Sequence, residues 1–153
     1  MQRRFTYPTT GHAGIQALRD LEIHLRGCGL EPPLLELVKM RASQINGCAY
    51  CLDMHSKDAR AAGETEQRLY VLDAWREAPF YTERERAALD WTEAVTRVAD
   101  GHVPDVVYEH VKQHFDEHEL VNLTLAVIAI NGWNRLAIGS RAEAGSHRTK
   151  SRG

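Results

Sequence analysis

The sequence lacks an apolar segment long enough to cross a membrane, and it lacks the apolar stretch of a secretory signal. Its most apolar run covers residues 123–130, far short of the roughly 20 residues that a bilayer requires. Arg3 and Arg4 near the N-terminus are not followed by an apolar stretch, which argues against a secretory signal. We therefore expect a cytoplasmic protein without a membrane segment, in which the apolar run forms a buried helix.

An excess of charge of one sign is also missing. The chain has 19 Lys and Arg residues against 21 Asp and Glu residues, which gives a formal net charge of -2. No global basic field would attract nucleic acid or anionic lipid, so neither is an expected partner. The 153 residues, with 43% hydrophobic and 26% charged residues, fit one ordinary globular domain. Such a chain is long enough to bury roughly two-thirds of its unfolded surface.

Cysteine is scarce, and its number is odd. Only Cys28, Cys48 and Cys51 are present, and without a secretory signal this argues against a structural disulfide framework. In a reducing compartment, a close cysteine pair is more often catalytic or metal-binding. Cys48 and Cys51 are therefore the candidates, whereas Cys28, between two glycines, is interpreted as a small residue at the end of a helix.

Strand patterns are absent as well. No stretch of five or more residues alternates convincingly between apolar and polar, and no Asn-Gly turn joins β-branched runs. Proline, glycine and a possible capping box at 82–85 instead mark the ends of helices. The sequence predicts an all-α domain over residues 1–141 and a basic, disordered tail over 142–153. We expect helices at about 12–27, 33–46, 47–62, 65–76, 82–99, 104–115 and 117–139.

The predicted helix at 117–139 is apolar on nearly all sides between Leu120 and Ile130. A helix that is apolar all round must be covered all round. In a chain of this length a neighbouring subunit is a plausible cover. The pattern therefore favours a homo-oligomer.

The chemistry-bearing segment contains Cys48, Cys51 and His55. At about 100° per residue, these three residues lie within a sector of roughly 60° on one helix face. Cysteines at i and i+3 have Cα atoms about 5–6 Å apart, within the range for a disulfide. The helix start favours a thiolate, most strongly at Cys48. His55, four residues after Cys51, is placed to accept a thiol proton.

A thiolate beside a second thiol can reduce a peroxide, through a sulfenic acid that closes to a disulfide. Alternatives stay open: a general thiol–disulfide oxidoreductase or redox sensor, or a zinc site built from Cys48, Cys51, His55 and a carboxylate. The residues are also compatible with small buried hydrophobes beside a core histidine. A c-type haem site is excluded because Leu52, not histidine, follows Cys51. His110 and His114 lack an evident third ligand, so we expect no metal and no cofactor.

Together these residues carry a resemblance. Glu36, Cys48, Cys51 and His55 are spaced as in the E-x11-C-x2-C-x3-H signature, which resembles that of AhpD-like alkylhydroperoxidases in the carboxymuconolactone decarboxylase superfamily. The resemblance extends over roughly residues 14–140. It implies an all-helical fold of six to seven helices, assembly as trimers or hexamers, and peroxide reduction through the cysteine pair. The segments that agree with the family are 36–47, 58–63 and 130–135.

The resemblance also implies roles for single residues. Cys51 would attack the peroxide, Cys48 would close the disulfide, and Glu36 with His55 would form a proton relay. Electrons would come from a lipoylated protein or another dithiol. A helical wheel over 33–46 places Glu36 opposite the apolar side, so the wheel alone predicts a solvated carboxylate. Tyr50 stands where some family members carry a second histidine.

Overall fold

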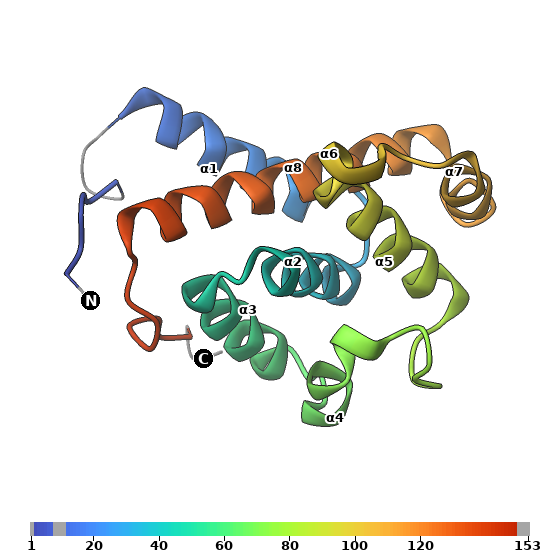
Figure 1. Cartoon of the computed structure of the whole chain (residues 1–153), viewed down its shortest axis with the longest axis horizontal. Helices are drawn as coiled ribbons and strands as arrows, with labels where there is room; N and C mark the ends of the chain where they lie inside the picture. The colour runs from blue at the N-terminus through green and yellow to red at the C-terminus, as the bar shows by residue number, and fades with distance from the viewer. Residues whose placement is uncertain (1, 8–11, 150–153) are drawn as a thin grey trace.

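The computed structural model describes residues 2–7 and 12–149, and these form helices joined by short connections (Figure 1). No strand occurs within these ranges, so the all-α prediction is confirmed. Helix α2 lies in the middle of the molecule, with α3, α5 and α8 packed around it. The elements are α1 (Ala13–Arg26), α2 (Pro32–Asn46), α3 (Ala49–Ala61), α4 (Glu66–Tyr70), the short 3-10 helix η1 (Leu72–Ala74), α5 (Glu83–Thr96), α6 (Val98–Gly101), α7 (Asp105–Val111) and α8 (Glu117–Ser140).

Local signals account for most helix ends. Pro32 and Pro33 occupy the first turn of α2, where a missing N–H costs nothing. Thr82 and Glu85 form the predicted capping box at the start of α5, each side chain bonding the other residue's backbone N–H,. A second capping box, between Asp116 and Glu119, begins α8.

Two predicted helices are divided in the structure. The segment expected as one helix at 65–76 is α4 followed by η1, because the chain leaves the helical path at Val71. The break lets Leu69, Leu72 and Trp75 all reach the same buried cluster. The segment expected at 82–99 ends at Thr96 and resumes as α6. At the first break tertiary packing outweighs local helix propensity, which is a weak signal on its own,.

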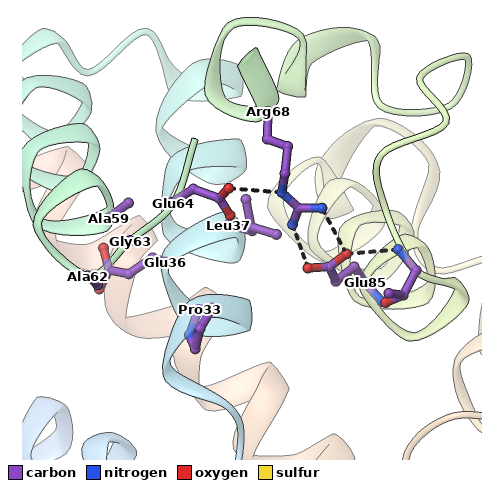
Figure 2. Close-up of a pocket in the computed structure, with 10 residues that line it drawn as sticks. Pro33, Glu36, Leu37, Ala59, Ala62, Gly63, Glu64, Arg68 and Glu85 are labelled. Atoms are coloured by element: carbon purple, nitrogen blue, oxygen red, sulfur yellow. Dashed lines mark hydrogen bonds and ion pairs between the residues drawn. The ribbon is translucent and has the colours of Figure 1, made fainter. Parts of the chain in front are cut away.

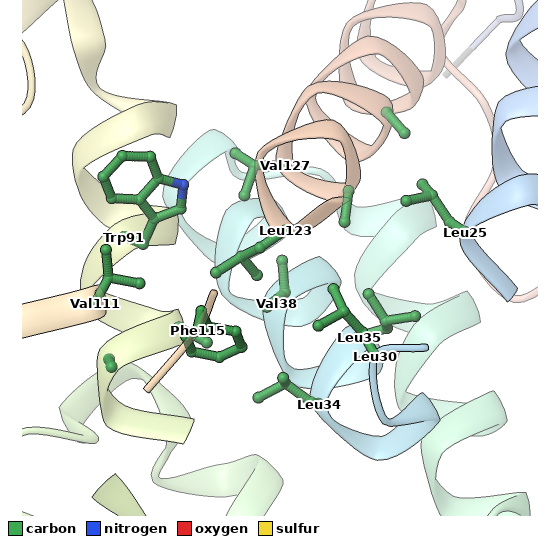
Figure 3. Packing of buried hydrophobic residues seen from close by; sticks show 14 residues of the cluster. Leu25, Leu30, Leu34, Leu35, Val38, Trp91, Val111, Phe115, Leu123 and Val127 are labelled. Atoms are coloured by element: carbon green, nitrogen blue, oxygen red, sulfur yellow. The ribbon is translucent and has the colours of Figure 1, made fainter. Parts of the chain in front are cut away.

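The main hydrophobic core lies between α1, α2, α5, α7 and α8 (Figure 3). Leu34, Leu35 and Val38 of α2 face Leu123 and Val127 of α8, and all five are at most 5% exposed. Burial of each such side chain stabilises the fold by about 1.5–3 kcal/mol. The core therefore fixes α2 against α8, the two helices that flank the site described below.

Helix α8 contains the apolar run that the sequence predicted to be buried. By length and composition alone it could cross a membrane, although 44% of its most apolar window is buried inside the protein. Val121, Ile128 and Ile138 are 58%, 52% and 47% exposed. These three are the large apolar side chains of α8 that this chain leaves exposed. Homo-oligomer formation stays a prediction.

The two terminal segments lie on the side of the molecule where α3 begins (Figure 1). Residues 2–7 run beside the end of α8, where the Arg4 backbone N–H donates to the Ser140 carbonyl at 3.0 Å. Residues 142–149 were predicted to be disordered, but they follow a defined path along α3. The Gly145 N–H donates to Asp53 at 2.9 Å, and His147 Nε2 lies 2.8 Å from Asp58. Residues 150–153 of the predicted tail lie outside the described residues.

Candidate redox site at the start of helix α3

The turn between α2 and α3 determines where the cysteines lie. Gly47 ends α2 in the left-handed conformation, with φ 65° and ψ 34°, which glycine adopts at little steric cost. The Cys48 N–H then donates to the Ser43 carbonyl at 3.0 Å. Cys48 is the N-cap residue of α3, one position earlier than the predicted first turn, and Cys51 lies within the first turn. The chain therefore holds Cys48 at the positive end of the helix dipole.

The two cysteines, called the dithiol below, are buried and are not joined by a disulfide. Their Sγ atoms are 2.6 Å apart, and each residue is only 1% exposed. A hydrogen bond from Cys51 lowers the pKa of Cys48 to about 7; burial opposes this shift, and the amides of Cys51 and Tyr50 reinforce it. The hydrogen bond to Cys48, together with burial, raises the pKa of Cys51. Near neutral pH the pair therefore shares one proton, with the negative charge favoured on Cys48.

The predicted Glu36 and His55 come together across two helices. His55 Nδ1 lies 2.9 Å from Glu36 Oε2, and His55 is 7% exposed. Burial alone would raise the pKa of Glu36, but the hydrogen bond and charge of His55, with Lys39 and Arg26, lower it overall. The wheel prediction of a solvated Glu36 is wrong, because Glu36 lies against α3 and pairs there with His55. Within the described residues, no hydrogen bond joins the His55 ring to either sulfur.

A pocket reaches the Glu36 side of this pair. Its volume is about 290 Å³, and it lies between α2, α3 and the start of α5 (Figure 2). Glu36 and Leu37 form one wall, Ala59 and Gly63 another, and Arg68 closes the far end. The Glu36 carboxylate therefore pairs with the buried His55 and also lines this pocket.

Asn134 of α8 is the polar residue that the sequence left without a role. It is fully buried, its Oδ1 accepts from Asn46 Nδ2 at 2.8 Å, and its Nδ2 donates to Ser43 Oγ at 3.0 Å. Its side chain also hydrogen-bonds both cysteines and lowers the pKa of each. A sequence signal for this role was present, because Asn134 is a polar residue between Ile130 and Ala137 on one face of the helix. Ile130 and Ala137 pack against the dithiol.

Tyr7 was not predicted as part of the site. It is half-buried on the segment 2–7, and its ring centroid lies 6.2 Å from that of Trp133. Burial, together with the negative charges that Tyr50, Cys51 and Cys48 can carry, raises the pKa of Tyr7 to about 12. The residue lies in a segment without apolar periodicity, so no sequence pattern connected it with the cysteines.

Comparison with known proteins identifies the family. Residues 12–94 match the model of the carboxymuconolactone decarboxylase family. The chain belongs to this family. This match extends well beyond the cysteine motif and supports the resemblance to the AhpD-like members.

Relatives and solved structures agree with this family assignment. The uncharacterized protein YdfG of Bacillus subtilis is 43% identical over 144 residues, which cover 93% of this chain and 98% of YdfG. A crystal structure from Agrobacterium tumefaciens, of a protein of unknown function suggested to be the antioxidant defence protein AhpD, is 42% identical. It covers 95% of this chain and 100% of that one, with a TM-score of 0.90. The debrominase Bmp8 shares the fold alone, at 18% identity and a TM-score of 0.77 over 86% of this chain and 70% of its own.

The remaining candidates lie away from the dithiol. Within residues 2–7 and 12–149, no group of three or more His, Cys, Asp or Glu residues is arranged to hold a metal ion. Cys28 packs against the main core. The rings of His110 and His114 meet edge to face with their centroids 5.6 Å apart, and His110 Nδ1 lies 3.7 Å from Asp90 Oδ2. In this member of the carboxymuconolactone decarboxylase family, the chemistry-bearing groups therefore gather at the start of α3.

Proposed function

We propose that this chain is a thiol-dependent peroxidase that reduces hydroperoxides through Cys48 and Cys51, with Glu36 and His55 moving protons. The observation that carries the proposal is the buried dithiol, whose sulfur atoms lie 2.6 Å apart beside a histidine–carboxylate pair. The pKa of Cys48, lowered to about 7, supplies the dithiol with one negative charge near neutral pH, as attack on a peroxide requires. The AhpD suggestion for the Agrobacterium relative supports the same activity.

The reaction balances with two thiols and one hydroperoxide. A thiolate attacks the terminal oxygen, an S–O bond forms, the O–O bond breaks, and the departing alkoxide takes a proton to become an alcohol. The second sulfur then attacks the sulfenic acid, an S–S bond forms, and hydroxide leaves as water with the second thiol's proton. An external dithiol, such as a lipoylated protein, reduces the disulfide by exchange.

The order of the cysteines rests on the family resemblance. We assign the attack to Cys51 and the resolving step to Cys48, as the family resemblance implies. His55 lies one helical turn beyond Cys51, and its Nδ1 is occupied by Glu36, which leaves Nε2 to accept the Cys51 proton. The resting charge on Cys48 does not prevent this, because a proton can pass between sulfur atoms that are in contact. The pocket beside Glu36 offers the relayed proton a route to water.

The test is turnover of an organic hydroperoxide with a dithiol reductant, followed in single-cysteine variants. Cys51→Ser should abolish turnover, and Cys48→Ser should allow one sulfenic acid to be trapped on Cys51 without disulfide closure. Cys28→Ser is the matched control and should retain full activity. Normal turnover in Cys51→Ser would contradict the assigned order, and normal turnover in both site variants would contradict the function.

A general thiol–disulfide oxidoreductase is the second candidate. The same observation favours it, because a contacting dithiol with one pKa near 7 is also suited to exchange. Fast exchange with small disulfides, combined with slow peroxide consumption, would select it. Zinc measured in freshly purified protein at about one ion per chain would instead support the metal-binding alternative. The cytoplasmic location stays a prediction.

A further inference from the structure

The carboxylate of Glu36 meets a different partner at each of its two oxygen atoms. Oε2 lies 2.9 Å from His55 Nδ1 on α3, and Oε1 lies 3.9 Å from Lys39 Nζ, three residues further along α2. The first distance is that of a hydrogen bond, and the second is that of an ion pair without a direct bond. The two contacts together restrict the direction in which the carboxylate points.

Lys39 is held beside Glu36 by a second carboxylate. Its Nζ donates to Glu22 Oε2 of α1 at 2.9 Å, and only 7% of the residue is exposed. A lysine this deeply buried needs charged partners for its ammonium group, and here Glu22 and Glu36, on different helices, provide them. The ammonium is therefore fixed in place, whereas a lysine at the surface keeps most of its rotamer freedom.

The carboxylate of Glu36 has a second direction open to it. Glu36 also lines the pocket of about 290 Å³ between α2, α3 and the start of α5, and water in this space would compete with His55 for the carboxylate. Arg68 lines the same pocket, but it is paired with Glu64 at 2.9 Å and with Glu85 at 2.6 Å, so its charge is already neutralised. A contact on the other side of Glu36 must therefore keep the carboxylate out of the pocket.

The ionisation of Glu36 determines which atom carries the hydrogen of its bond to His55. Burial alone would raise the pKa of Glu36, but the bond and charge of His55, with the charges of Lys39 and Arg26, lower it overall. An ionised carboxylate can only accept a hydrogen bond. His55 therefore donates through Nδ1–H, and its Nε2 is left with a free lone pair.

We propose that Lys39 is a positioning residue for the Glu36–His55 pair: its ammonium keeps the carboxylate turned towards His55 and out of the pocket. While the carboxylate is held there, His55 keeps its hydrogen on Nδ1 and presents Nε2 as a base. If the carboxylate turns away, the ring exchanges between its two tautomers, and the one with hydrogen on Nε2 cannot accept a thiol proton. The consequence for peroxide turnover rests on the proposed function, but the positioning does not.

The test is the tautomer of His55, read from the nitrogen-15 chemical shifts of its ring nitrogens at about pH 9, where imidazoles are neutral. The parent protein should show the Nδ1–H tautomer alone, and Lys39→Met should show a mixture of both. The titration midpoint of the Glu36 carboxyl, followed by its carbon-13 shift, should rise by about one unit in Lys39→Met. This is the low end of the effect of a neighbouring opposite charge, because His55 still lowers the pKa of Glu36.

Three variants separate positioning from a merely structural role. Lys39→Arg keeps the cation and should retain the parent tautomer. Lys57→Met removes a lysine that is paired with Asp53 at 2.8 Å on α3, and it should change neither reading. Glu22→Gln weakens the link between α1 and α2 but keeps the ammonium beside Glu36, so it should keep the Nδ1–H tautomer and should not raise the Glu36 midpoint. A purely structural role of Lys39 predicts that Glu22→Gln and Lys39→Met behave alike.

Lys39→Met leaves Glu22 without its cation, so a double variant guards against loss of the fold. Lys39→Met combined with Glu22→Gln removes both charges of the α1–α2 pair, and it should show the same mixture of tautomers. Persistence of the Nδ1–H tautomer alone in either folded variant would overturn the proposal. Identical behaviour of Lys39→Met and Glu22→Gln would also overturn it, as would the Nε2–H tautomer in the parent protein.

Peroxide turnover gives a separate reading. The kcat/KM of Lys39→Met should fall about tenfold, a part of the roughly 10²–10⁴-fold that a positioned acid or base contributes, and Lys39→Arg should restore most of it. The tautomer reading needs no turnover. An inactive parent protein would therefore contradict the proposed function, while the spectra alone would still decide whether Lys39 positions Glu36.

Discussion

Replacement of Asn134 by leucine is expected to raise the pKa of the first proton lost by the dithiol. Asn134 is fully buried and hydrogen-bonds both cysteines. Leucine has a similar shape and would sit among the apolar neighbours Ile130 and Ala137. The substitution therefore removes the hydrogen bond without exposing the sulfur atoms.

The size of the effect follows from the hydrogen bond that is lost. A hydrogen bond to a charged group contributes about 1.5–3 kcal/mol, and one pKa unit corresponds to about 1.4 kcal/mol. The pKa of Cys48 should therefore rise from about 7 by about one unit, the low end of this range, because the larger effect of the hydrogen bond from Cys51 remains. At pH 7 the thiolate fraction would fall from about one half to about a tenth, with a matching fall in alkylation rate.

The assay is the ultraviolet absorbance of the thiolate, titrated with pH in a Cys28→Ser background so that only the dithiol contributes. Ser43→Ala is the matched control. It removes the 3.0 Å bond from Asn134 to Ser43 but leaves the Asn134 amide and its 2.8 Å bond from Asn46 in place. Its titration midpoint should move by less than about half a unit, because the donor to the thiolate remains. A midpoint in folded Asn134→Leu within about 0.3 units of the parent value would refute the reasoning.

Three further predictions concern stability, each measured by urea unfolding. Glu36→Gln should lower the free energy of unfolding at pH 7 by about 1 kcal/mol. Because the folded-state pKa of Glu36 lies below its ordinary 4.5, this loss should shrink as the pH falls below about 4. A difference in unfolding free energy that does not change with pH would contradict this prediction. Leu123→Ala, at a fully buried core position, should cost about 2–5 kcal/mol, and a cost under 1 kcal/mol would show that the site collapses. Thr82→Ala should cost about 1 kcal/mol through loss of the bond to the Glu85 N–H,, whereas Thr65→Ala at the short helix α4 should cost less.

Features set by local chemistry were predictable from the sequence. Gly47, Pro32 and the Thr82 capping box ended or began helices where expected, because each acts through its own backbone neighbours. The spacing of Cys48 and Cys51 placed the two sulfur atoms side by side for the same reason. These features needed no knowledge of tertiary structure.

Features set by the packing of distant segments were not predictable from helix geometry, and only the family resemblance linked Glu36 with His55. The helical wheel left Glu36 in solvent because a wheel ranks faces by polarity, and here the polar face of α2 is covered. Ser43 on that face is fully buried, and Lys39 is only 7% exposed. The cysteines contribute to the raised pKa of Tyr7, which lies on a segment without periodicity, so only the folded chain connects them.

The buried polar face of α2 explains how a reactive dithiol is held in a fixed place. Among the described residues, every buried side-chain nitrogen or oxygen has a hydrogen-bond partner. Four polar residues of α2 reach four different helices, so rotation or sliding of α2 would break several buried pairs at once. Breaking one buried ion pair by removal of a partner typically costs about 3–5 kcal/mol, more than a slipped apolar contact. The pairs are Lys39 with Glu22 of α1, Glu36 with His55 of α3, Arg41 with Glu93 of α5, and Ser43 with Asn134 of α8. Because the last of these helices also presents Asn134 to the sulfur atoms, the register of α2 and the ionisation of the dithiol are coupled through the same side chain.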